Sequence, residues 1–434
     1  MTNHQETHSN LCTLDRIDLF KNALYQNDIT GSTWVRINRV EAGEGSSNLQ
    51  FQIEGTSHYL DLQSTVLELN LKITKKNGDQ LDADTEVALV NLPGSSIFLR
   101  KILSIKDNVI LNQQNYNLAS FLAQECTYNE ASKKNWLAAT GIYYRDTPGH
   151  HDTLGAANIG YTKRKDLFSD SKTVQVFSPV FDPLFMQDVY FLNNLSLKLE
   201  LGLEKPEKCI MSAVNADVKL NITKAVLHVK KITVSQEKDL KIQSTLMKQN
   251  AVYPITRPAL VTKTIGSGWK TAHLQNFNME QELPTKIMVV LTDESANTGT
   301  SNQNPFNFKH FNLNSFNILV NSTSIYGEAI KCDFANDHYL EIYFETMKSL
   351  YHINVDGCGI NIGDYKNGSA IFGGDLTPSQ CEGDVYRDPF QTGSVEIKLE
   401  FEVPLPSVIT VHAYLQYENN IFIDRDRKVT KDFE

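Results

Sequence analysis

An internal repeat is the feature that most constrains how this chain can fold. The segment Ser196–Pro206 (SLKLELGLEKP) resembles the later segment Glu396–Pro406 (EIKLEFEVPLP). Asp188–Tyr190 precedes the first copy, and Asp384–Tyr386, with the same three residue types, precedes the second. Self-similarity at one offset indicates a duplicated structural unit. With 434 residues, the chain is long enough for two such units, each with its own core.

Both copies alternate apolar and polar residues, and the same alternation runs through Thr65–Ile73. Because successive side chains of a strand point to opposite faces, a period of two predicts a half-buried strand. In Thr65–Ile73 the predicted inner residues are Leu67, Leu69, Leu71 and Ile73, and the predicted outer residues are Glu68, Asn70 and Lys72. Each copy of the repeat is followed by a further predicted strand, Leu220–Val229 in the first half and Val408–Tyr417 in the second.

A weaker correspondence links earlier parts of the two halves. Ile102–Ile105 runs into the polar turn Lys106–Asn108, and Asn317–Val320 runs into a polar turn that ends at Ile325. Both read as a strand, a tight turn and a short return strand. Many short strands joined by polar loops, at 143–160, 293–305 and 352–370, predict an all-β fold of the sandwich, jelly-roll or barrel type.

Helical periodicity is rarer. Asn117–Thr140 and Ser235–Gln249 are the two main candidates, and a short helix is expected near Leu14–Leu24. The predicted apolar positions are Leu118, Phe121, Leu122 and Cys126 in the first candidate and Leu240, Ile242 and Leu246 in the second. We therefore predict a β-rich chain with a few short helices.

These patterns predict five segments. They are an N-terminal arm at 1–33, a first β-domain at 34–234, a helical linker at 235–252, a second β-domain at 253–425 and a C-terminal tail at 426–434. The arm is polar and slightly acidic. It is either a disordered terminus or an arm that clamps a neighbouring subunit.

The charge balance argues against a protein that coats nucleic acid by itself. The formal net charge is −10, whereas phosphate binding needs a concentrated positive field. The basic runs Lys72–Lys76 and Lys163–Lys165 are short, and we expect both to be solvated. The six cysteines are scattered without a C-x-x-C pair, which is typical of free thiols in a reducing compartment. We expect neither a signal peptide nor a membrane span.

No motif for catalysis, cofactor binding or metal binding is present, so no site residue of these kinds is predicted, and no cofactor. Four candidate segments have simpler explanations. His150 and His151 are expected in a plain loop, and His310 as a hydrogen-bonded residue among aromatic side chains. Glu341 and Glu345 lie in a strand-like segment without an acid–base partner, and Asp424–Arg427 is expected to be a solvated charged tail.

Several short segments, in order, resemble the major capsid proteins (hexon-type) of adintoviruses and of polinton or Maverick virus-like elements. The resemblance covers about Trp34 to Arg427. It is carried by Tyr59–Leu62, Ser95–Phe98, Ile105–Ile110, Tyr144–His150, Phe185–Asp188, Tyr253–Ile255, Asn304–Phe308 and Asp424–Arg427.

The resemblance implies a double jelly roll, two eight-stranded β-sandwiches side by side. It implies a structural protein and not an enzyme. Three copies would form a pseudo-hexameric capsomer, and capsomers would tile an icosahedral shell around a double-stranded DNA genome. The implied partners are the protein itself, neighbouring capsomers, and penton and minor capsid proteins, without sequence-specific nucleic-acid binding. The implied location is the virion, after synthesis in the host cytoplasm and with the nucleus as a candidate assembly site.

Two other interpretations stay open. A carbohydrate-binding or glycan-processing protein with two jelly rolls would share the fold. A vertex (penton) protein of the same virus type normally needs a single jelly roll, so the repeat disfavours it.

Overall fold

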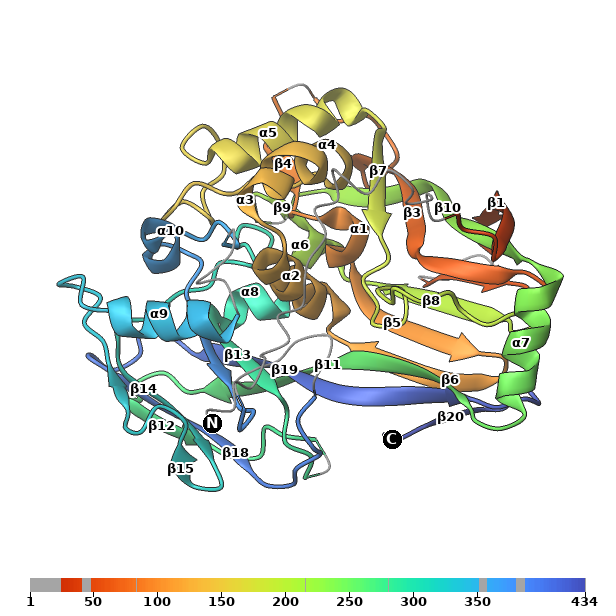
Figure 1. Cartoon of the computed structure of the whole chain (residues 1–434). Helices are drawn as coiled ribbons and strands as arrows, with labels where there is room; N and C mark the ends of the chain where they lie inside the picture. Colours follow the sequence, from red (N-terminus) through yellow and green to blue (C-terminus); the bar gives the residue numbers. More distant parts are fainter. Residues whose placement is uncertain are drawn as a thin grey trace, which may run out of the picture.

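The computed structural model describes residues 25–40, 48–82, 84–214, 216–279, 281–350, 357–379 and 387–433. The segment near Leu14–Leu24 predicted to be helical lies outside these residues. The described chain forms two β-sandwich lobes side by side, with helices gathered on one side and between them (Figure 1).

The first lobe consists of two antiparallel four-stranded sheets. One has the order β1-β10-β3-β7 and the other the order β2-β8-β5-β6. Their bounds are β1 Ile29–Asn38, β2 Asn48–Ile53, β3 Tyr59–Lys75, β5 Phe98–Ile105, β6 Asn108–Gln114, β7 Val174–Pro179, β8 Leu197–Leu203 and β10 Val218–Val234.

The second lobe repeats this plan. Its sheets have the orders β11-β19-β13-β17 and β12-β18-β14-β15, with β20 added to β19 and β16 added to β14. Their bounds are β11 Ala251–Ile265, β12 Thr271–Leu274, β13 Lys286–Asp293, β14 Leu313–Val320, β15 Thr323–Ser324, β16 Ile330–Lys331, β17 Ile371–Asp375, β18 Val395–Phe401, β19 Ile409–Ile423 and β20 Val429–Lys431.

The two lobes correspond strand for strand. The repeated sequence segments form β8 and β18, each the second strand of its sheet, and the strands that follow them in the halves form β10 and β19. The turn between β5 and β6 has a positive φ at Lys106, and the turn between β14 and β15 has positive φ at Asn321 and Ser322. Such turns match the twist of the strands they join. The duplication predicted from the repeat is therefore present in the topology.

Helices occupy the connections between strands. The main ones are α2 Tyr116–Thr127, α5 Ile159–Phe168, α7 Gln236–Leu246 and α9 Leu340–Ser349. The shorter ones are α1 Pro93–Ser96, α3 Glu130–Ser132, a π-helix at Lys133–Leu137, α4 Ala138–Gly141, a 3₁₀ turn at Ser169–Ser171, α6 Pro206–Cys209, α8 Glu294–Thr298 and α10 Ile362–Lys366, and the small strands β4 Val87–Leu89 and β9 Ile210–Ser212 pair with each other.

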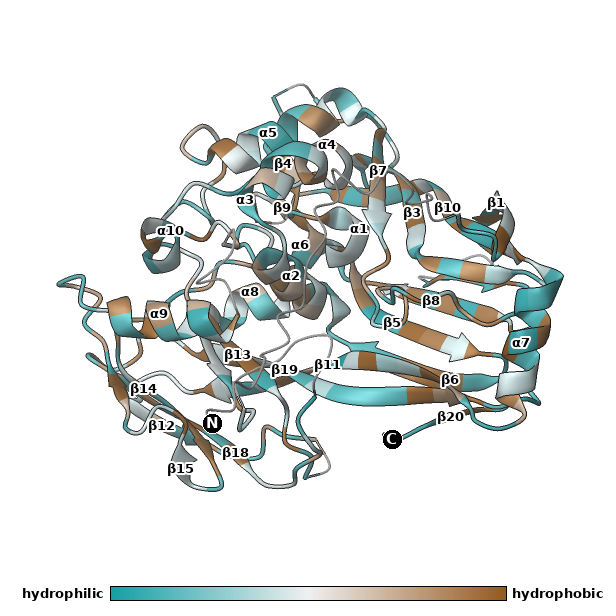
Figure 2. Ribbon diagram, in the orientation of Figure 1, coloured by the Kyte–Doolittle hydropathy of each residue, from teal (hydrophilic) through white to brown (hydrophobic). Residues whose placement is uncertain are grey.

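The two predicted helical segments are confirmed. The first is divided into α2 and the short helical turns that follow it, and the second is α7, which Ser235 caps by accepting a hydrogen bond from the Lys238 N–H. One predicted apolar position of α7 is wrong, because Leu240 is 62% exposed whereas Leu246 is buried. Figure 2 shows that most of α7 is polar, in contrast to the apolar strands β5 and β8.

The predicted alternation along β3 is confirmed, with one correction. Leu67, Leu69 and Leu71 are buried in the first lobe. Glu68 was expected to face solvent, but it is only 3% exposed, because the side chains of Lys224, His228 and Gln175 enclose its carboxylate. A buried carboxylate is tolerated when donors satisfy it in this way.

The sheets extend beyond the segment limits predicted from sequence. β1 begins at Ile29, inside the predicted arm, and β11 begins at Ala251, inside the predicted linker. β20 lies in the predicted tail and pairs with β19. Ile29, Ala251 and Val429 at these positions pack into or against the first-lobe core. A single apolar residue next to polar ones shows no period in the sequence, so these extensions were not predicted.

Candidate assembly unit: the junction between the two lobes

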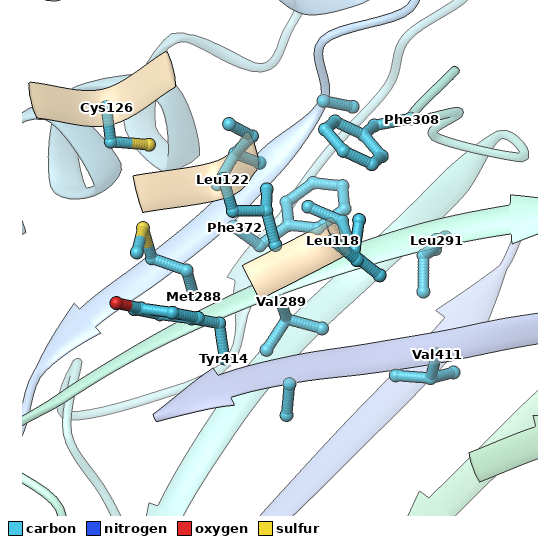
Figure 3. Close-up of a cluster of buried hydrophobic side chains, with 14 of the residues drawn as sticks. Leu118, Leu122, Cys126, Met288, Val289, Leu291, Phe308, Phe372, Val411 and Tyr414 are labelled. Carbon is cyan, nitrogen blue, oxygen red and sulfur yellow. The ribbon is translucent and has the colours of Figure 1, made fainter. Parts of the chain in front are cut away.

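At the junction, each lobe contributes side chains to the hydrophobic core of the other. Helix α2 follows β6 of the first lobe, but it packs into the core of the second. The ring of Phe121 on α2 stacks on the ring of Phe306 with 4.0 Å between centroids. Figure 3 shows Leu118, Leu122 and Cys126 of α2 above the second-lobe strands that carry Met288, Val289, Leu291, Val411 and Tyr414. The helix thus serves as a shared core element.

The second lobe in turn contacts the core of the first lobe through its longest strands, β11 and β19. β11 and β19 pair over fifteen consecutive residues, from Ala251↔Ile423 to Ile265↔Ile409, and reach below the first lobe (Figure 1). Tyr253, Ile255, Ile421 and Ile423 from their far ends are buried in the first-lobe core. Burying each such side chain contributes about 1.5–3 kcal/mol.

Polar anchors complete this contact. The Tyr253 hydroxyl accepts a hydrogen bond from the Leu192 N–H (3.0 Å) and lies 3.2 Å from the Tyr190 carbonyl oxygen. Arg427 donates from Nε to the Asn193 carbonyl oxygen (3.0 Å) and from Nη2 to Asn193 Oδ1 (2.6 Å). The prediction that Asp424–Arg427 is wholly solvated is wrong for Arg427, which is 8% exposed. A guanidinium can be buried when its donors are paired.

A buried ion pair holds the loop between α4 and α5, which belongs to the first lobe and contacts the second. Arg164, predicted to be solvated, is fully buried in α5. It donates to the carbonyl oxygens of Leu89 (2.8 Å) and Tyr144 (2.7 Å) and to Asp146 Oδ1 (2.8 Å). The amide of Asn304 in the second lobe donates to the other oxygen of Asp146 (3.0 Å). The charge on a run of basic residues does not reveal this burial, because the partners come from distant segments.

Arg145, next to Asp146, also bridges the lobes. Its Nη1 donates to the carbonyl oxygen of Gly359 (2.5 Å) and to Asp364 (3.0 Å), both in the second lobe. Its Nη2 lies 3.2 Å from Glu130. Buried Lys133 donates to the carbonyl oxygen of Cys358 (2.8 Å) and forms an ion pair with Glu125 (3.0 Å). Such bonds fix orientation, because a displaced partner would leave a buried charge unpaired.

The histidine loop lies at the same junction. Asp152 accepts hydrogen bonds from the Asn304 N–H (2.8 Å) and the Asn307 amide (2.7 Å) and forms an ion pair with Lys309 (3.1 Å). His151 is 7% exposed, and burial lowers its pKa. Its ring contacts the backbone of Gly368, where a Cβ would lie 2.2 Å from the ring. His150 and His151 thus lie in a loop, as predicted, but the loop joins the lobes.

His310 is part of an aromatic stack, as predicted. Its ring stacks on Phe334 with 4.1 Å between centroids, and its Nδ1 accepts a hydrogen bond from the Asn312 N–H (3.0 Å). Burial and the nearby Lys366 lower its pKa to about 4, so the imidazole is neutral at pH 7. A hollow of about 280 Å³ lies beside it.

Glu341 and Glu345 were placed in a strand-like segment, and this prediction is wrong, because both lie in α9. The buried positions of that helix are Ile342, Thr346, Met347 and Ser349, which are at helical spacing. This helical spacing is present in the sequence. It was missed because two of the buried positions, Thr346 and Ser349, are polar and do not stand out as an apolar pattern.

In the described residues, no group of three or more His, Cys, Asp and Glu is placed to hold a metal ion. No helix in the same residues is long and apolar enough to cross a membrane. The side chains of Cys126, Cys209, Cys332 and Cys358 are buried, as predicted, whereas Cys12 and Cys381 lie outside the described residues.

No protein-family model matches the chain. An uncharacterized protein of Caenorhabditis elegans, F54H12.2, is 24% identical over 396 residues, which cover 88% of this chain and 92% of the relative.

Among solved structures, a chain of the Sputnik virophage, determined by electron cryo-microscopy, has a TM-score of 0.68 at 12% identity and covers 100% of this chain and 95% of that one. The mavirus major capsid protein has a TM-score of 0.58 at 11% identity, covering 100% and 97%. A chain of the PBCV-1 virus capsid has a TM-score of 0.58 at 11% identity, covering 96% and 99%. The predicted fold class, a double jelly roll, is therefore confirmed.

Proposed function

We propose that this chain is a viral major capsid protein whose assembly, and not catalysis, is its function. The main support for this proposal is the strand order, which is the same in the two lobes. Elements of each lobe are also buried in the core of the other, which holds the two lobes as one unit. Three copies of a two-lobed unit give six similar lobes, which is the number needed for a pseudo-hexameric capsomer. Capsomers of this shape tile an icosahedral shell, which is proposed to enclose double-stranded DNA.

The junction suits this role for a physical reason. A capsomer with hexagonal outline requires a fixed angle between the lobes of each chain. The shared helix α2 and the buried ion pairs set that angle more firmly than a flexible linker would. The net charge of −10 fits a shell that leaves DNA condensation to another protein.

The lineage is also a proposal. The resemblance to adintovirus and polinton proteins, together with a relative encoded by a nematode, supports a virus-like element of animals. The proposed segments are an arm at 1–33, jelly rolls at 34–234 and 253–425, a linker at 235–252 and a tail at 426–434, with β1, β11 and β20 extending the jelly rolls past these limits. Penton and minor capsid proteins are the proposed further partners, and the virion is the proposed location.

The solution mass of the purified protein tests this proposal. Light scattering coupled to size exclusion should give a stable species near three times 49.0 kDa that resists mild dilution. A trimer interface closes by joining two different surfaces of neighbouring chains, and obligate interfaces of this kind bury on the order of 2,000–5,000 Å². A monomer at every concentration would contradict the proposal and favour the glycan-binding alternative, which a glycan array would then test.

A further inference from the structure

Strand β1 is an edge strand with little to pack against. None of its ten residues is buried, and Trp34 at its centre is 55% exposed. In the described part of the chain, β10 is the only strand that pairs with it. A long exposed edge strand is a template for pairing with another chain.

The outer side of β1 offers intact backbone donors. The Arg39 N–H donates to the Ala225 carbonyl oxygen (3.3 Å), continuing the register of Asn38↔Val226. Because donors alternate between the two sides of an antiparallel strand, the N–H groups of Ser32, Trp34 and Arg36 point away from β10. Within the described residues, no strand accepts a hydrogen bond from these three donors.

The equivalent strand of the second lobe is protected. β11 is also the first strand of its sheet, but it contains Pro254 and Pro258. Proline lacks an N–H, so it is tolerated where the backbone nitrogen faces away from the neighbouring strand, and it removes the edge donor at each of these two positions. β11 is moreover buried at Tyr253, Ile255 and other positions. The equivalent edge strands therefore differ: β1 is exposed and keeps its outer N–H groups, whereas β11 is partly buried and carries two prolines.

The charge beside β1 favours an acidic partner. Arg36 and Arg39 lie on and just after the strand, and Lys231 lies on β10, opposite Thr33. Among the residues that the structure describes, none of these three cations forms an ion pair. A second copy of this chain, with a net charge of −10, is complementary to such an edge.

The position of β1 fits contact between copies. Figure 1 shows β1 on the side of the first lobe that is far from β12 and β14 of the second lobe. In a ring of three two-lobed chains, the side of one lobe that faces away from its own partner lobe must meet the next copy.

We propose that the outer edge of β1 pairs with an extended segment of a second copy within the trimer, with Trp34 buried in that contact. This inference rests on the proposed function, since it names the interface by which the capsomer closes. Backbone pairing would supply the register, and burial of Trp34 would supply much of the affinity.

The test compares trimer dissociation on dilution, measured by light scattering, for the full chain and its variants. The double variant Ser32→Pro/Arg36→Pro repeats the spacing of Pro254 and Pro258 and removes only donors that face away from β10. Trp34→Ser is the second variant. Each should raise the dissociation constant about thirtyfold or more, with an unchanged circular dichroism spectrum.

Two controls define the result. Arg36→Gln separates loss of charge from loss of the donor, and Trp269→Ser removes a tryptophan that is 61% exposed in the second lobe. Both should weaken the trimer less than the test variants. If the test variants form trimers as stable as the natural chain, the inference is overturned while the proposed function stands. If the natural chain itself is not a trimer, both fail.

Discussion

The first and second lobes share one strand order but differ in their connections. Between β6 and β7 the first lobe carries α2 to α5, and α2 is buried in the second lobe. The equivalent connection of the second lobe carries α9 and α10, and α9 packs on its own strand β17. Instead, the ends of β11 and β19 of the second lobe are buried in the core of the first lobe. A duplicated sheet topology has thus been joined into one body by parts that are not duplicated.

The largest effect is expected where α2 enters the second lobe. Phe121→Ala removes a ring stacked at 4.0 Å on Phe306 and should cost about 4 kcal/mol of unfolding free energy. Urea unfolding, followed by circular dichroism, measures this. Phe344→Ala, at a position 53% exposed, is the matched control and should cost under about 1 kcal/mol.

The shape of the urea unfolding curve also tests whether the two lobes form one body. If the lobes share their cores, the natural chain should unfold in one cooperative step. Two separate steps, with Phe121→Ala shifting only one, would show that the lobes are independent.

The buried ion pair should have the next largest effect. Arg164→Met leaves the Asp146 carboxylate buried without its cation and should cost about 3 kcal/mol. Lys163→Met, at the exposed neighbouring position, should change stability by under about 0.5 kcal/mol. Adding Asp146→Asn to Arg164→Met should recover part of the loss. Equal effects of the two single variants would contradict a junction role for Arg164.

A buried histidine should make the second lobe sensitive to acid. His412 on β19 lies between the hydroxyls of Thr262 (3.2 Å) and Thr292 (3.0 Å), and burial lowers its pKa to about 4. The folded state favours the neutral ring, so stability should fall as the pH drops from 6.5 to 4. The loss attributable to this group should be about 3 kcal/mol.

His412→Gln removes the titration and is measured by urea unfolding at pH 7 and pH 4. The difference between these two values should be smaller in the variant than in the natural chain. The same difference in both would show that His412 does not set the acid response.

The first lobe should respond to acid through a carboxylate, with a smaller effect. Hydrogen bonding from Lys224, helped by His228 and Gln175, lowers the pKa of Glu68 to about 2. Its stabilisation is present above the ordinary value near 4.5 and should be lost as the pH falls toward 2. Because Lys224 is partly exposed, Glu68→Gln should cost only about 1 kcal/mol at pH 7.

Thermal unfolding between pH 2 and pH 6 measures this prediction. The natural chain and Glu68→Gln should converge at the lowest pH. A gap of constant size across the range would mean that packing, and not charge, carries the role of Glu68.

The sequence predicted the elements that depend on local periodicity. The alternation in β8 and β18 and the helix α7 were predicted correctly, because strand and helix periods are local. The order of the repeated segments gave the duplicated plan.

The junction was not readable, because its contacts join distant residues. Arg164 and Arg427 sit in basic or mixed-charge runs that usually face solvent, and only the tertiary fold brings Asp146 and Asn193 to them. Nor does the apolar period of α2 reveal that the core it enters is that of the other lobe. Periodicity shows that a face is buried, but not by which partner.

Electron micrographs of the purified native species test the central claim most directly. Class averages should show particles with three-fold symmetry and a near-hexagonal outline formed by six similar lobes. Single two-lobed particles, or rings whose lobes vary in angle within each chain, would contradict the claim that this protein is a rigid double jelly roll built to close into a pseudo-hexameric capsomer.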